Sequence, residues 1–212
     1  MLLDRARVKF WQRWVFGAMA VIMAGSLVVF TLSDVSGCNG SSGAVEEIDA
    51  DIARYQAAVE VDPEDVAAWR SLAESYLFRS NQWQQDPAKQ QADLRSAVAA
   101  YEEAEKVLAK QKGAEVKQLR LDTLKQLATI YLTLGEYQLA TSVYGQITDL
   151  TPKDPQAYFE MASVALNAGD TNTALLAFTR YLELDPDAPD ADAVREWIEE
   201  NAPSAPGGGG GE

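Results

Sequence analysis

Histidine is absent from this chain of 212 residues, and cysteine occurs once, at position 38. Without histidine the sequence lacks the commonest general base and the commonest metal ligand, and a lone cysteine cannot build a disulfide framework. The phosphate-binding, dinucleotide-binding, zinc-protease and serine-hydrolase signatures are absent as well. We therefore expect no enzyme activity, no cofactor, no metal site and no small-molecule substrate.

Positive charge is scarce and unevenly placed. The chain has 18 lysines and arginines against 32 aspartates and glutamates, which gives a net charge of −14. Residues 1–13 hold four basic side chains and one acidic side chain, so this segment carries 4 − 1 = +3 and the remainder carries −14 − 3 = −17. Such an acidic surface repels phosphate backbones, so nucleic acid is not an expected partner.

One long run without a charged residue covers residues 14–32, with the sequence WVFGAMAVIMAGSLVVFTL. As a helix this run spans about 28 Å, close to the bilayer's hydrocarbon thickness of roughly 30 Å. Basic side chains precede it, and tryptophans lie at positions 11 and 14, where an interfacial belt is expected. We expect a cytoplasmic basic segment at 1–13, a single transmembrane anchor at 14–33, and the rest of the chain outside the bacterial cytoplasmic membrane.

Other interpretations of this N-terminal region stay open. A buried core helix does not need so long an uncharged run, and a cleaved secretory signal usually has a shorter apolar stretch of about 7–15 residues. Residues 35–38, VSGC, resemble a bacterial lipobox, in which the cysteine is lipidated and becomes the new N-terminus. Asp34 departs from that pattern. Lipidation of Cys38 is therefore the second expectation, and it also tethers the chain outside the membrane.

Two segments are expected to lack regular structure. Residues 34–44 are rich in glycine and serine, a composition that is typical of a flexible linker. Residues 202–212 read APSAPGGGGGE and contain no large apolar side chain, so we expect a disordered tail there.

The segment between linker and tail repeats with a period of thirty-four residues. Pairs of similar residues keep this spacing: Leu124 and Tyr158, Ala128 and Ala162, Gly135 and Gly169, Ala140 and Ala174, Tyr144 and Phe178, and Pro152 and Pro186. The residue types and the period resemble the tetratricopeptide-repeat family, in which each repeat is a pair of antiparallel helices. The resemblance implies an all-α fold, a right-handed α-solenoid of helix pairs. The uncharged run at 14–32 places a single transmembrane helix before it.

An earlier copy of the repeat is stretched. Trp69 to Tyr101 spans 32 residues where Leu124 to Tyr144 spans 20, and the twelve additional residues lie around the glutamine-rich segment 79–92. The sequence before Leu124 also predicts that its helix starts about two turns early. We expect a repeat domain at 45–201, divided into a half-repeat 45–63, a stretched repeat 64–112, repeats at about 115–154 and 155–188, and a capping helix 189–201.

In this family the first helix of each repeat lines a concave groove. Residues beside the core positions of these helices are expected to contact a partner: Arg70, Glu74, Leu77, Phe78, Lys125, Thr129, Leu132, Phe159, Ser163 and Leu166. Glu74 and Glu160 oppose the carboxylate clamp known in the family, so the expected ligand is a helix or extended peptide with apolar anchors. The alternative is that Leu132, Phe159 and Leu166 only pack against adjacent repeats. Trp83 is either a second contact or a plug over the elongated helices.

These features predict a non-enzymatic, membrane-tethered scaffold that binds another protein or peptide outside the cytoplasmic membrane and helps to assemble an envelope complex. Membrane-anchored tetratricopeptide subunits of cytochrome c biogenesis have a similar layout, which makes that machinery one specific alternative. A structural protein that oligomerises through the array is another.

Overall fold

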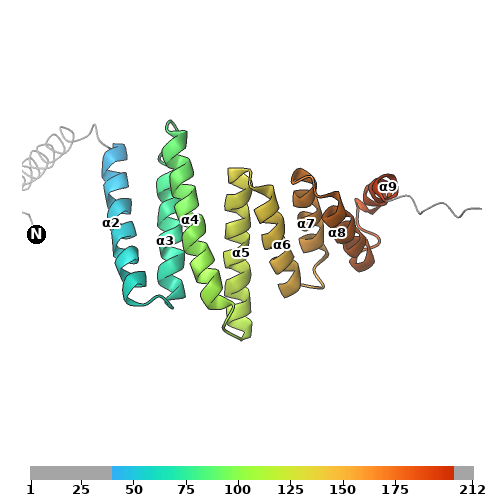
Figure 1. The fold of residues 1–212 in the computed structure, drawn as a ribbon, viewed down its shortest axis with the longest axis horizontal. Helices are drawn as coiled ribbons and strands as arrows, with labels where there is room; N and C mark the ends of the chain where they lie inside the picture. The colour runs from blue at the N-terminus through green and yellow to red at the C-terminus, as the bar shows by residue number, and fades with distance from the viewer. Residues whose placement is uncertain (1–39, 203–212) are drawn as a thin grey trace, which may run out of the picture. The chain divides into compact units, whose positions relative to one another are not determined.

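A computed structural model gives the fold, and it describes residues 40–202 (Figure 1). These residues form helices joined by short turns, and no strand occurs among them. The helices are α2 (Gly40–Val61), α3 (Val66–Ser80), α4 (Pro87–Leu108), α5 (Ala114–Leu134), α6 (Tyr137–Leu150), α7 (Pro155–Asn167), α8 (Thr171–Leu184) and α9 (Ala191–Asn201). The all-α prediction is confirmed.

Several predicted features lie outside the described residues. These are the basic segment 1–13, the transmembrane anchor 14–33, Cys38 and nearly all of the tail. Among α2 to α9, no helix combines the length and the hydropathy that a membrane crossing requires.

The predicted linker 34–44 differs from the structure at its C-terminal end. Helix α2 begins at Gly40, so residues 40–44 are helical and not extended. Once a helix is nucleated, each added residue gains a backbone hydrogen bond, and the growth can pass through residues of low helix propensity. The apolar positions Ile48 and Ile52 anchor this helix on the core, which composition alone does not indicate.

Capping residues set the ends of the helices. Four helices begin after an aspartate whose side chain accepts a backbone N–H of the first turn: Asp65, Asp86, Asp154 and Asp170. These oxygens satisfy donors that have no partner inside the helix. Gly135 ends α5 in the left-handed conformation, with φ of 73°, and the following residue donates its N–H to the Tyr131 carbonyl. Glycine adopts this conformation with little strain, as predicted for the end of a first helix.

The repeats lie in one compact unit that begins at Ile48. Within it, each helix from α3 to α8 packs on the next one along the chain. The interior contains alanines that are at most 1% exposed: Ala73, Ala97, Ala128, Ala140, Ala162 and Ala174. Larger side chains such as Tyr101 and Leu124 are buried beside them. Small residues let helix backbones approach and large ones fill the remaining volume, which agrees with the roles predicted from the repeat.

The stretched repeat is still a pair of helices, α3 and α4, but α4 and the loop before it are longer than their counterparts in the next repeat. Helix α3 has one more residue after Trp69 than α5 has after Leu124, and the loop 81–86 is four residues longer than the loop between α5 and α6. Helix α4 starts seven residues earlier before Tyr101 than α6 does before Tyr144. Together these are the twelve additional residues. Helix α5 starts ten residues before Leu124, whereas α7 starts three before Tyr158, so the two-turn extension is confirmed. The insertion is thus mainly a continuation of α4 that begins at Pro87.

Candidate partner-binding surfaces

The surface along α3, α5 and α7 contains the residues predicted to contact a partner, and we call it the first-helix groove. Half of the predicted residues are exposed there: Glu74, Phe78, Lys125, Thr129 and Leu166. Phe78 is 66% exposed and Leu166 is 38% exposed, so both present apolar surface to solvent. The hydroxyl of Thr129 donates to the Lys125 carbonyl at 2.9 Å, which leaves the apolar side chains as the stronger contact candidates.

The other predicted groove residues are half-buried: Arg70, Leu77, Leu132, Phe159 and Ser163. Leu132 packs against the main core. Phe159 packs on α8, with ring centroids 5.7 Å from Phe178 and 5.2 Å from Tyr181. For Phe159 and Leu132, therefore, packing against neighbouring helices describes the structure better than a groove contact. Adjacent helices approach closely enough to cover these large side chains, and a single-helix pattern does not show this.

A cavity of about 250 Å³ lies in the first-helix groove between α3 and α5. Its lining includes three predicted residues and three others: Glu74, Leu77, Phe78, Asn81, Tyr101 and Gln126. Tyr101 is 1% exposed, and burial, with a smaller effect of Glu74, raises its pKa to about 12. The prediction took residues of α5 at intervals of four and three from Lys125. Gln126 directly follows Lys125, so that spacing left it out. The predicted residues of α7 do not reach this cavity.

Trp83 lies half-buried over a charged network that joins three helices. Its indole N–H donates to Asp93 Oδ2 at 2.8 Å, and the Lys89 ammonium lies 4.7 Å from its ring centroid. Asp93 also accepts two hydrogen bonds from Arg79, at 2.6 and 2.9 Å. Arg79 reaches α2 as well, where it pairs with Asp49. These contacts fit the interpretation of Trp83 as a plug over the elongated helices.

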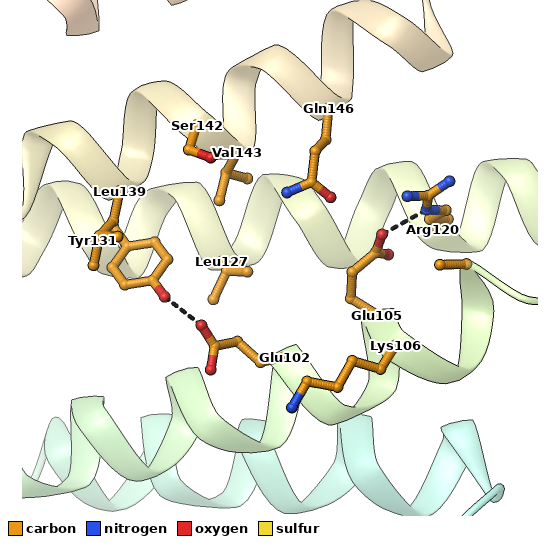
Figure 2. A pocket seen from close by; sticks show the side chains of 11 residues that line it. Glu102, Glu105, Lys106, Arg120, Leu127, Tyr131, Leu139, Ser142, Val143 and Gln146 are labelled. Atoms are coloured by element: carbon orange, nitrogen blue, oxygen red, sulfur yellow. Dashed lines mark hydrogen bonds and ion pairs between the residues drawn. The ribbon is translucent and has the colours of Figure 1, made fainter.

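A larger cavity, of about 400 Å³, opens elsewhere on α5. We call it the second-helix pocket, because α4 and α6, the second helices of two consecutive repeats, form its walls (Figure 2). It is lined by Glu102, Glu105, Lys106 and Ala109 of α4 and its end, Arg120, Leu127 and Tyr131 of α5, and Leu139, Ser142, Val143 and Gln146 of α6. Leu127 follows Lys125 by two residues, about 200° around the helix, so this pocket and the first-helix groove lie on different sides of α5.

Two glutamates of α4 turn toward α5 in this pocket (Figure 2). The Tyr131 hydroxyl donates to Glu102 Oε1 at 2.6 Å, and Arg120 Nε donates to Glu105 Oε1 at 2.6 Å. Glu105 is only 8% exposed. Its Oε2 is buried and receives no hydrogen bond from any residue of the described chain.

Desolvation dominates the electrostatics of the second-helix pocket. Burial raises the pKa of the Glu105 carboxyl, and the hydrogen bond from Arg120 offsets this only in part. Burial also raises the pKa of Tyr131, and its bond to Glu102 raises it further. An ionised carboxylate offers about four acceptor sites. Glu105 therefore has acceptor capacity that residues 40–202 do not use.

The sequence did not predict this pocket. Glu102 is half-buried and accepts a hydrogen bond from Tyr131, which lies 29 residues further along the chain. The early start of α5 was the available signal, because those two turns bring Arg120 beside Glu105. Within residues 40–202, no group of three or more acidic or cysteine side chains is arranged to hold a metal ion.

Two family models, both described as tetratricopeptide repeat, match residues 127–199 and 47–85. Together they cover 73 + 39 = 112 of the 212 residues. The chain belongs to the tetratricopeptide-repeat family. Tetratricopeptide-repeat proteins are generally non-enzymatic scaffolds for protein–protein interaction. Comparison with the curated proteins gives no match.

Solved structures with tetratricopeptide-like arrays resemble this chain at low sequence identity. MamA is 14% identical, with 74% of this chain and 87% of MamA covered and a TM-score of 0.44. The APC/C hetero-tetramer Cut9-Hcn1 is 17% identical, with 75% and 40% covered and a TM-score of 0.40. YrrB, described as a TPR protein with an unusual peptide-binding site, is 17% identical, with 73% and 86% covered and a TM-score of 0.31.

Replacing Glu105 by glutamine is expected to stabilise this tetratricopeptide domain at neutral pH. Because the folded chain holds the Glu105 proton to higher pH than the unfolded chain does, ionisation of this group opposes folding. Stability is therefore lost as the pH rises above the ordinary carboxyl pKa of 4.5, and Glu105→Gln avoids that loss. Urea unfolding of both proteins at acidic and neutral pH should show the variant's advantage growing with pH. A constant difference, or a less stable variant at neutral pH, would contradict this assignment.

Proposed function

We propose that this protein is a membrane-tethered scaffold whose repeat domain binds another protein or peptide outside the cytoplasmic membrane and so helps to assemble an envelope complex. The observation that carries the proposal is the apolar surface beside the cavity of the first-helix groove. Phe78 is 66% exposed at that cavity, and Leu77 lines it as well. Exposed aromatic side chains next to a depression are frequent anchors of protein interfaces.

The tether in this proposal rests on the N-terminal sequence. Residues 14–32 contain no charged side chain, and residues 1–13 carry a net charge of +3. A run of this length suits a single membrane crossing with the basic end in the cytoplasm. Lipidation of Cys38 is the competing route to the same location.

The groove is tested by combining Phe78→Ala with Lys125→Glu in the full-length chain. Both side chains are exposed, so the fold should survive while the apolar anchor is lost and a charge is reversed. We expect crosslinked capture of the partner from membranes to fall about tenfold, the equivalent of roughly 1.4 kcal/mol. Quantitative mass spectrometry of the captured proteins measures the change.

The matched control combines Leu176→Ala with Lys153→Glu, which makes the same kinds of change away from the groove. Leu176 is 75% exposed and Lys153 is exposed in the turn before α7. This variant should capture the partner as the original chain does. If both variants lose it equally, the groove is not the binding surface; if the chain captures only copies of itself, the structural alternative replaces the scaffold.

The tether is tested in the same membrane preparations. Cys38→Ala should stay in the membrane fraction after carbonate extraction, whereas deletion of residues 14–32 should release the chain. Release by Cys38→Ala would instead establish the lipoprotein anchor. Retention of the deletion variant would exclude residues 14–32 as the tether.

A further inference from the structure

The second-helix pocket holds more negative charge than its own cations neutralise. Glu102 and Glu105 both line it, and the only cations in its lining are Arg120 and Lys106. Arg120 donates a hydrogen bond to Glu105 at 2.6 Å, whereas Lys106 bonds to Glu103 Oε1 at 2.6 Å. Within the described lining, Glu105 is thus paired with Arg120, whereas Glu102 accepts a hydrogen bond from the neutral Tyr131 hydroxyl and has no ion pair.

Glu105 is the residue that indicates a missing contact. It is 8% exposed, and its Oε2 has no hydrogen-bond partner in residues 40–202. Leaving a buried charged acceptor unsatisfied costs more free energy than leaving a buried neutral one unsatisfied. The terminal torsion of a glutamate is soft and moves both carboxylate oxygens together, so a small rotation can bring Oε2 toward a donor in the cavity. A further donor would therefore offset a desolvation penalty that the chain already bears.

The apolar part of the lining suits the stem of a long basic side chain. Leu127, Val143 and Ala109 line the cavity together with Leu139, which is 48% exposed. Arginine and lysine lay an aliphatic stem along apolar surface and keep a charged head for acceptors. The cavity volume of about 400 Å³ lies within the roughly 300–1,000 Å³ range of small-ligand sites.

We propose that the second-helix pocket binds an arginine or lysine side chain of the partner protein, with the cation at Glu105 and Glu102 and the stem along Leu127 and Val143. The inference rests on the proposed scaffold function and names one contact through which it acts. The surroundings favour such a partner, because residues 40–202 hold 14 basic against 29 acidic side chains, a net charge of 14 − 29 = −15. An acidic surface steers basic segments toward it.

The test uses two blocked pentapeptides, Gly-Gly-Arg-Gly-Gly and the same peptide with citrulline, which keeps the shape of arginine and lacks its charge. Each is titrated into the isotopically labelled full-length chain, and the amide resonances of Val143 and Gln146 are followed. We expect saturable shifts with the arginine peptide and at least tenfold weaker binding of the citrulline peptide. A lysine peptide should bind at the same place. Equal binding of arginine and citrulline would overturn the proposal.

Two variants separate the pocket from general charge attraction. Glu102→Gln combined with Glu105→Gln should weaken arginine binding about tenfold or more, the scale of one charge-assisted hydrogen bond. Glu199→Gln combined with Glu200→Gln removes the same charge from the exposed end of α9 and should leave binding unchanged. Equal weakening by both variants, or arginine shifts that lie outside α4, α5 and α6, would overturn the proposal.

The same pocket variant in the membrane capture experiment separates this inference from the proposed function. Reduced partner capture supports both. Undiminished capture by the pocket variant, together with loss in the groove variant, would overturn the basic-side-chain contact and leave the scaffold standing. If the original chain captures no partner, the scaffold proposal itself fails.

Discussion

Raising the pH from 10 to 12 is expected to unfold the repeat domain. Tyr101, Tyr131 and Tyr181 are at most 5% exposed. Burial raises the pKa of all three phenols from the ordinary 10.0, to about 12 for Tyr101 and Tyr181. Above pH 10 the unfolded chain releases protons that the folded chain retains, so stability falls as the pH rises through this range.

The expected size of this effect is large. Each such phenol lowers the free energy of unfolding by about 1.4 kcal/mol per pH unit. The full slope holds only between the two pKa values of each phenol, and three phenols acting together still remove a large part of the stability of about 5–15 kcal/mol that a domain of this size has.

Far-UV circular dichroism and tyrosinate absorbance, recorded in one pH titration, measure the transition. The chain has eight tyrosines, so the part of the absorbance that comes from the three buried phenols should rise together with the loss of helicity, because these phenols ionise only when the helices come apart. Tyr101→Phe keeps the ring and removes one titrating hydroxyl, so it should shift the transition to higher pH and reduce its slope by about a third. Full ionisation of all eight tyrosines while helicity is retained would show that the buried phenols titrate in the folded protein.

Replacing Arg79 by methionine should destabilise the N-terminal part of the array by about 3–5 kcal/mol, the usual loss when one partner of a buried ion pair is removed. The Asp93 side chain is 7% exposed and that of Arg79 is 23% exposed. Without Arg79, the Asp93 carboxylate keeps only the indole N–H of Trp83. The pair with Asp49 on α2 is lost as well, so α2 should loosen from α3 and α4.

Urea unfolding, followed by circular dichroism of the full-length chain, gives the free energies for this comparison. The matched control is Arg54→Met, because Arg54 and Asp51 form an exposed pair within α2, with side-chain exposures of 63% and 43%. Exposed pairs contribute about 0–1 kcal/mol. Equal losses in the two variants would mean that the network beneath Trp83 adds nothing beyond an ordinary surface pair.

Helix order and helix ends were largely predictable, because both depend on local patterns. A period of thirty-four residues, glycines that close first helices and prolines that follow second helices predicted the pairs from α5 to α8. The stretched repeat was also recognisable, since its core residues keep their types. The prediction of a flexible linker was wrong for residues 40–44. Helix α2 extends through them, although their composition favours a flexible chain.

The candidate binding surfaces were only partly predictable, for a physical reason. A face drawn along one helix identified Glu74, Leu77 and Phe78 at the groove cavity. It could not show that Phe159 is covered by α8. The burial of a side chain depends on the neighbouring helix, and the sequence of one helix alone does not determine how closely two helices pack.

The sequence by itself determined the family, the helix pairs and the acidic character of the domain, because each follows from residue type and spacing along the chain. Only the tertiary structure decided that Trp83 covers a buried ion pair and that Glu102 and Glu105 share a pocket with α5 and α6. Glu102 and Tyr131 are 29 residues apart in sequence, and no local pattern connects them. Packing brings such groups together, and desolvation then gives them properties that a solvated carboxylate or phenol lacks.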